Sequence, residues 1–180
     1  MMTPISWYPL VGRRVIPILI KDGGSAMLES MDMVDHIDAE RAPVLTGDER
    51  PEIGNIADRL LKTTPPQTMP RHPLLPLPEF ATVTARDHFI VCKQKVFNSF
   101  VELRARTREF LVDLIPVLDD LDRLIKSSQA VNGELSRDDV RILPLLLSAA
   151  VVQALVFPQK VRAYFENMME RTGFDPLPVV

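Results

Sequence analysis

The first clear secondary-structure signal in the chain is an apolar run that contains a proline. Residues 15–20 read VIPILI, and the turn sequence DGGS follows at residues 22–25. Two consecutive glycines supply the positive φ angles of a tight turn, so residues 15–28 are predicted to form a hairpin. Proline cannot donate to a β-ladder. Pro17 is therefore expected at a sheet edge, at a bulge or at the start of a strand, or after a cis peptide bond at a binding site.

Length and charge narrow the class of protein. A chain of 180 residues can bury a hydrophobic core, and its length fits one domain, or one domain and a smaller appendage. The net charge of −3 argues against nucleic acid or an anionic membrane as a partner. Arg104, Arg106 and Arg108 alternate with apolar and acidic residues, which favours a solvated helix face over a phosphate-binding patch.

The chain has a single cysteine, Cys92. One cysteine excludes an internal disulfide framework and favours the reducing cytosol, so a cytoplasmic location is expected. A reactive thiol needs a helix N-terminus, a nearby cation or a second cysteine to lower its pKa. Cys92 instead lies well inside a predicted helix, which favours a buried structural residue over a nucleophile.

No secretory signal is visible at the N-terminus. The longest nearly apolar run, residues 142–157, is shorter than the ~20 residues that a bilayer requires, and Pro144, Ser148 and Gln153 interrupt it. A buried core helix is therefore predicted for this run.

Helical periodicity begins after the hairpin. Ser30 is expected to cap a helix that ends near residues 41–43 and buries Met33, Val34 and Ile37. A second helix is expected to open at Pro51 and to bury Ile53, Ile56, Leu60 and Leu61. Residues 63–78 hold six prolines. They favour an extended loop packed through Leu74, Leu75 and Leu77, and a ligand for a proline-recognition domain is the alternative.

The rest of the chain is predicted to be helical. Thr82 or Thr84 caps a helix that packs through Phe89, Val96 and Phe97. Next comes a longer helix, bent at Pro116, whose apolar stripe comprises Phe110, Leu111, Leu114, Ile115, Leu118, Leu121 and Ile125. Ser136 and Asp139 form a capping box ahead of the next helix. The last helix begins at Pro158 and ends at Gly173.

The usual catalytic and metal-binding patterns are absent from the sequence. His36, His72 and His88 have spacings that suit no metal site, so solvated or core histidines are expected. The acidic pairs at residues 119–120 and 138–139 are explained by the helix dipole and by solubility. Nucleophile-elbow, P-loop and dinucleotide-binding glycine patterns are missing as well.

Two short segments could together bind a peptide-like ligand. If the bond before Pro17 is cis, the N–H and C=O of Ile16 are turned out of the ladder and can pair with an extended peptide. Glu29 and Ser30, at a helix start, can offer a hydroxyl, an N–H and the positive end of the helix dipole to a carboxylate. Glutathione needs both kinds of group. An edge-strand proline and an ordinary helix cap remain the alternative.

Several segments resemble the bacterial glutaredoxin 2 family, whose members have a glutathione-transferase-like architecture. They are VG at residues 11–12, VIPIL at 15–19, MLESMDMV at 27–34, PVLTG at 43–47 and AVNGELSRDD at 130–139. The resemblance implies that Pro17 is the cis-proline of a thioredoxin fold and that Ile16 pairs with the cysteinyl backbone of glutathione. It also implies that Glu29 and Ser30 hold the γ-glutamyl end.

The resemblance also sets the expected fold and function. It implies an α+β, mostly α chain, with a truncated thioredoxin-like part at residues 1–47, a first bundle helix and proline-rich loop at 48–78, and a helical domain at 79–180. Family members exchange thiols and disulfides with glutathione as co-substrate through a Cys-Pro-Tyr-Cys motif. The chain lacks that motif. No catalytic residue and no metal are therefore assigned, and whether the chain is an enzyme stays open.

Two functions follow as hypotheses. The first is a glutaredoxin 2-type oxidoreductase that is inactive as this shortened chain, with protein disulfides as partners only if the missing unit is restored. The second is a non-catalytic glutathione-binding or helical interaction module. A two-stranded sheet leaves the edge of residues 15–20 exposed, so we expect self-association, or a substitute strand from residues 5–11.

Overall fold

The computed structural model describes residue 12 and residues 15–180. The chain divides into two compact units, Met1–Leu45 and Thr46–Val180, and each is described by itself. The three-part division expected from the sequence stays a prediction. The substitute strand expected at residues 5–11 lies outside the described residues.

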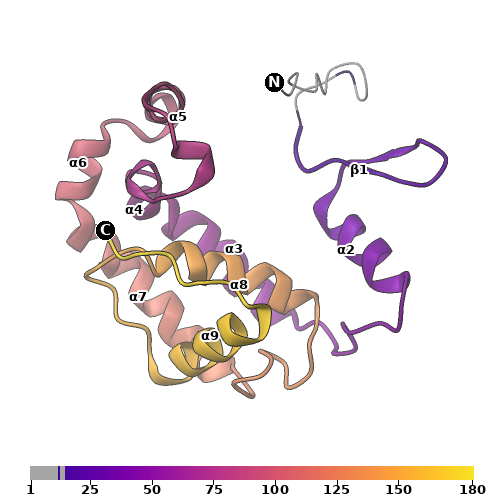
Figure 1. Cartoon of the computed structure of the whole chain (residues 1–180). Coiled ribbons are helices and arrows are strands. Elements are labelled where there is room, and N and C mark those ends of the chain that lie inside the picture. Colours follow the sequence, from indigo (N-terminus) through magenta and orange to yellow (C-terminus); the bar gives the residue numbers. More distant parts are fainter. Residues whose placement is uncertain (1–11, 13–14) are drawn as a thin grey trace. The chain divides into compact units, whose positions relative to one another are not determined.

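The first unit contains the predicted hairpin (Figure 1). Strands β1, Leu19–Ile20, and β2, Ala26–Met27, pair antiparallel, with Leu19 opposite Met27. The N–H of Gly24 donates to the carbonyl of Lys21 over 2.9 Å, and Gly23 and Gly24 have φ angles of 94° and 84°. The glycine turn therefore forms as expected, although the strands are shorter than the apolar run.

Helix α2, Ser30–Ala39, follows the hairpin. The expectation that Ser30 caps this helix is wrong, because Glu29 has extended backbone angles and takes the N-cap position without a side-chain hydrogen bond. Met33 is buried, but Ile37 is 57% exposed and does not join a core. Helical spacing shows which residues share a face of the helix, but not which part of that face another element covers. After the helix, the carboxylate of Asp38 accepts a hydrogen bond of 2.8 Å from the N–H of Val44.

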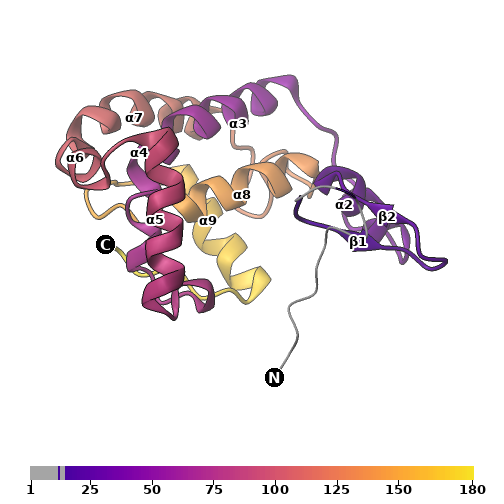
Figure 2. The ribbon, with the colours of Figure 1, turned by 90° about the horizontal axis from the view of Figure 1, so that it is seen from above.

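The second unit is helical (Figure 2). Its α-helices are α3 at Pro51–Thr63, α4 at Pro65–Thr68, α5 at Val83–Phe97, α6 at Phe100–Ala105, α7 at Thr107–Leu124, α8 at Arg137–Ala149 and α9 at Gln159–Thr172. Two 3₁₀ turns, η1 at His72–Leu74 and η2 at Pro78–Phe80, lie between α4 and α5.

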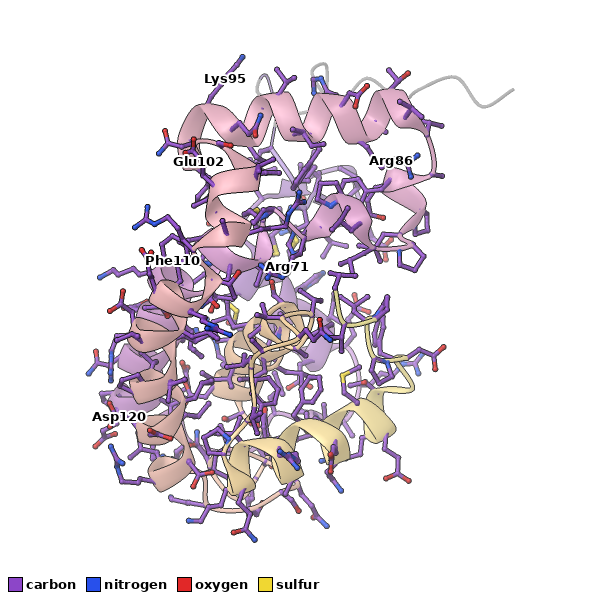
Figure 3. The ribbon with its side chains drawn as sticks, turned by 90° about the vertical axis from the view of Figure 1, so that its left-hand side faces the viewer. Arg71, Arg86, Lys95, Glu102, Phe110 and Asp120 are labelled. Atoms are coloured by element: carbon purple, nitrogen blue, oxygen red, sulfur yellow. The ribbon has the colours of Figure 1, made fainter. Side chains whose placement is uncertain are left out.

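The main core of this unit lies between α3, α7, α8 and α9. Helices α3 and α7 run side by side (Figure 2), and Arg59 of α3 forms an ion pair of 2.7 Å with Asp120 of α7. Asp120 is labelled on α7 in Figure 3. The fully buried side chains include Ile53, Leu60, Leu114, Leu118, Leu121, Ile142, Leu146 and Tyr164. The predicted opening of α3 at Pro51 is confirmed, but Leu61 of the predicted face is exposed.

The proline-rich segment is not the extended loop that its composition predicted. Pro65 and Pro66 start α4, and Pro73 lies in η1. Proline is well suited to the first turn of a helix, where its missing N–H is not required. Leu75 is buried as expected, whereas Leu74 is 54% exposed.

Helix α5 begins as predicted but packs differently. The Thr82 hydroxyl accepts a hydrogen bond of 3.2 Å from the N–H of Ala85, which confirms the cap. No residue of α5 is buried, and Val96, expected to pack, is exposed. Cys92 is exposed too, so the prediction of a buried cysteine is wrong. The apolar residues of α5 do not form one stripe, and no residue of α5 belongs to the main core.

The next predicted helix corresponds to α7. A short helix, α6, comes before it, and Arg106 separates the two. Leu111, Leu114, Leu118 and Leu121 are buried as expected, whereas Ile115 is 44% exposed. Pro116 lies inside α7, and the bend expected there stays a prediction.

The apolar run at residues 142–157 is helical only in its first half. Helix α8 ends at Ala149, and the N–H of Val152 bonds to the carbonyl of Ala149 over 3.1 Å in a tight turn. Val151 and Val152 are buried in a small cluster with Leu75. Helix α9 has Pro158 at its N-cap and ends at Gly173, where φ is 67°. None of the helices in the described part of the chain is long and apolar enough to cross a membrane.

Candidate functional site

The residues singled out for ligand binding flank the hairpin of the first unit. Ile16 and Pro17 precede β1, and Glu29 and Ser30 follow β2. Leu19 lies opposite Met27. Because the two strands are antiparallel, the start of β1 and the end of β2 lie at the same end of the hairpin, opposite the glycine turn. The hairpin thus directs both predicted segments to its open end.

The first segment has an unusual backbone. The peptide bond between Ile16 and Pro17 is cis, as the resemblance implied. Ile16 is 80% exposed, and Pro17 is exposed as well. No hydrogen bond to another described residue occupies the N–H or C=O of Ile16. That these groups pair with an extended ligand stays a prediction.

The second segment lies at the N-terminus of α2. Glu29 and Ser30 are exposed, and the Glu29 side chain makes no capping hydrogen bond. The first N–H groups of a helix lack partners within it and favour a negative charge. Within the first turn of α2, the acidic residue is Asp32, whose carboxylate also interacts favourably with these N–H groups.

None of the three histidines belongs to the two predicted segments. Nε2 of His72, in η1, lies 3.4 Å from the Ser148 hydroxyl, and burial together with Lys93 lowers the pKa of His72, against a smaller opposing effect of Glu79. Nε2 of His36 lies 3.6 Å from a Glu40 carboxylate oxygen. The residues that the structure describes contain no group of three His, Cys, Asp or Glu side chains arranged to hold a metal ion.

The exposed thiol is also on a different element. Sγ of Cys92 lies 3.6 Å from Nε2 of His88, one turn earlier in α5. No ligand-binding role is assigned to Cys92 and His88.

The acidic pair at residues 138–139 has a structural role that the sequence only half revealed. Ser136 and Asp139 form the predicted capping box. Both Asp138 and Asp139 are buried, so the expectation of a solubilising surface pair is wrong. Asp138 accepts a hydrogen bond of 2.8 Å from the N–H of Arg50, which ties the start of α8 to the segment before α3.

These features define a class of protein. In the described residues, a short hairpin with a cis-proline at its entry, one helix, and then an all-helical unit make up a glutathione-transferase-like chain. Residues 52–178 match the family described as "Glutaredoxin 2, C terminal domain". The chain belongs to the glutaredoxin 2 family.

The comparisons extend over nearly the whole chain. Glutaredoxin 2 from Escherichia coli K12 is 34% identical over 169 residues, which are 93% of this chain and 79% of the relative, and the O157:H7 protein gives the same values. The structure of Glutaredoxin 2 from Salmonella typhimurium in complex with glutathione has a TM-score of 0.86 and 32% identity. It matches 96% of this chain and 79% of that one. These relatives support the glutaredoxin 2-like, glutathione-dependent function expected from the sequence.

Proposed function

We propose that the open end of the hairpin in the first unit binds glutathione. The observation that carries the proposal is the antiparallel hairpin β1–β2, which has the exposed Ile16 and Pro17 before its first strand and the exposed Glu29 and Ser30 after its second. The Salmonella typhimurium relative, whose structure is a complex with glutathione, supports the same ligand.

Each residue then has a chemical role. The N–H and C=O of Ile16 pair with the cysteinyl backbone of glutathione, and Pro17 holds that segment in place. The γ-glutamyl end carries a carboxylate and an ammonium group. Ser30 and the N–H groups at the start of α2 bind the carboxylate, and the Glu29 carboxylate binds the ammonium group.

The proposal separates binding from catalysis. Thiol–disulfide exchange of the family type needs a Cys-Pro-Tyr-Cys motif, and these 180 residues contain one cysteine, on exposed helix α5. We therefore assign glutathione binding, but no turnover, to the chain as it stands. Protein disulfides become substrates only where a catalytic cysteine pair is supplied. We further propose that the protein acts in the cytoplasm.

Calorimetric titration of the full chain with glutathione tests the binding site. Ser30→Ala is expected to weaken binding about tenfold, because a hydrogen bond to a charged group is lost. Ser25→Ala is the matched control, since Ser25 lies exposed at the turn end of the same hairpin. No saturable binding by the parent chain, or equal weakening in both variants, would contradict the proposal.

A hydroxyethyl-disulfide reduction assay tests the absence of turnover. The full chain is expected to show no activity above the glutathione background. Activity that disappears in Cys92→Ser would overturn the assignment and make Cys92 a catalytic residue.

Self-association through β1 is a second proposal about the same unit. Among the described residues β1 pairs only with β2, and the side chain of Ile20 is exposed. An unpaired strand edge can template pairing with another chain, and a charge on the edge discourages it. Sedimentation is expected to show concentration-dependent dimers that Ile20→Lys reduces. A monomer at all concentrations would exclude this edge pairing.

A further inference from the structure

Helix α5 of the helical unit leaves one of its sides uncovered. Its other side packs on η1, η2 and α6, where the ring centroid of Phe89 lies 5.0 Å from that of Phe80 and 6.4 Å from that of Phe100. Successive residues are turned by about 100° around a helix, so Val91, two positions after Phe89, points to the opposite side. Val91 is 58% exposed. The face centred on Val91 is thus open to solvent.

One row of side chains runs along this open face. It consists of Val83, Asp87, Val91 and Lys95, and all of them are exposed. Residues four positions apart are neighbours on a helix surface, so the row is continuous. It runs from Val83, the first residue of α5, to Lys95 in the last turn. We call these residues the α5 row.

The two charges of the α5 row lie symmetrically about Val91. Asp87 comes four positions before Val91, and Lys95 comes four positions after it. Neither charged side chain makes a hydrogen bond or an ion pair with another described residue. The Lys95 side chain points away from the helical unit (Figure 3). An acid and a base at equal distances from an apolar centre make the row complementary to its own reverse.

This symmetry matches the geometry of a two-fold dimer. In such an interface the same patch is used on both subunits, and every contact between residues i and j occurs twice. A two-fold axis beside Val91 brings the valines of two copies together and places Asp87 of each copy opposite Lys95 of the other. Rows of residues four apart are inclined to the helix axis, so antiparallel helices that cross at about 50° align them. The contact then has an apolar centre with an ion pair on each side.

We propose that a second copy of this chain packs antiparallel on the α5 row. Nucleic acid or an anionic membrane requires a positively charged face, whereas this row carries one charge of each sign. A single pair of helices buries less area than a standard protein–protein interface, so the dimer is weak and forms at high protein concentration. The interface is separate from the edge of β1, which lies in the first unit.

Sedimentation equilibrium of the full chain tests the dimer. An Ile20→Lys background is used throughout, because it suppresses pairing through β1. Self-association is expected at protein concentrations up to about 1 mM. A monomer over this whole range would overturn the proposal.

Charge reversals place the association at the α5 row. Asp87→Lys and Lys95→Asp are each expected to weaken the dimer about tenfold, because each turns two attractive pairs into repulsive ones. The double variant restores both pairs with reversed signs and is expected to dimerise like the parent. Asp113→Lys, on α7, is the matched control, since it makes the same charge change at another exposed residue. Equal weakening by Asp87→Lys and Asp113→Lys, or no recovery in the double variant, would contradict the interface.

Cross-linking tests the position of the two-fold axis. In a Cys92→Ser background, Val91→Cys places one thiol of each copy beside the axis, and mild oxidation with diamide is expected to give a disulfide-linked dimer. Val112→Cys is the control, because Val112 is 70% exposed on α7, outside the α5 row. Equal cross-linking of the two variants would indicate random collision and would refute this arrangement.

Discussion

The hydroxyl of Tyr164, in α9, donates a hydrogen bond of 2.9 Å to Oδ1 of Asp139, in α8, and both side chains are buried. The same carboxylate accepts hydrogen bonds from the main-chain N–H groups of Val131, at 2.8 Å, and Ser136, at 2.9 Å. One buried acid thus joins α9 to the capping box of α8 and to the loop before it. Because each partner is desolvated, the network contributes to stability only when it is complete.

The first prediction concerns the loss of this hydroxyl. Tyr164→Phe is expected to lower the free energy of unfolding by about 1–2 kcal/mol, because Asp139 loses a buried donor while the ring remains. Thr172→Val is the control, since it removes an exposed hydroxyl that bonds to the carbonyl of Met169. Urea unfolding measures both. Equal stabilities for the two variants would show that the Tyr164 bond is unimportant.

The second prediction is a pH dependence at the alkaline end. Burial, reinforced by the charge and hydrogen bond of Asp139 and by Asp138, raises the pKa of Tyr164 well above its ordinary value. The protonated form is then favoured in the folded state. Its stabilising effect is complete below the unfolded-state pKa of about 10 and is lost as the pH rises beyond it, by up to about 1.4 kcal/mol per pH unit.

Urea midpoints at several pH values between about 8 and about 11 test this linkage. Because Tyr164→Phe cannot ionise at this position, its stability should fall less steeply above pH 10. Parallel pH profiles for the parent and the variant would contradict the assignment.

The third prediction compares two glycines of the helical unit. A Cβ on Gly47 would lie 2.5 Å from the carbonyl oxygen of Glu134, whereas one on Gly54, inside α3, would meet nothing within 4 Å. Gly47→Ala is expected to cost about 1–3 kcal/mol of stability through backbone displacement. Gly54→Ala is expected to add about 0.5–1 kcal/mol through helix propensity. Thermal melts of the two variants should shift in opposite directions, and a neutral Gly47→Ala would refute the close approach.

The fourth prediction concerns the exposed cysteine. Since Cys92 is exposed on α5, one thiol per chain should react with Ellman's reagent without denaturant. Cys92→Ser should show none. If the parent chain reacts only after unfolding, the exposure of α5 is wrong, and the buried position first expected from the sequence is correct.

Much of the fold follows from local sequence signals. Gly23 and Gly24 determine the hairpin turn, Thr82 the start of α5, Ser136 with Asp139 the start of α8, and Gly173 the end of α9. Each signal depends on interactions between residues a few positions apart, so it can be recognised from the sequence alone. The predicted binding segments at Ile16 and Ser30 also lie beside one hairpin, and their role stays a prediction.

Burial and long-range contacts were decided by the tertiary structure. The sequence predicted a solvated Arg104 and Arg108, and both are exposed, but it did not predict that they lie near Arg71, which is more than 30 residues away in the chain. It also predicted a buried Cys92, which is exposed, and a solubilising role for the pair Asp138 and Asp139, which is buried. Helical periodicity shows which residues share one face of a helix. Whether that face is buried depends on other elements, which are distant in the sequence.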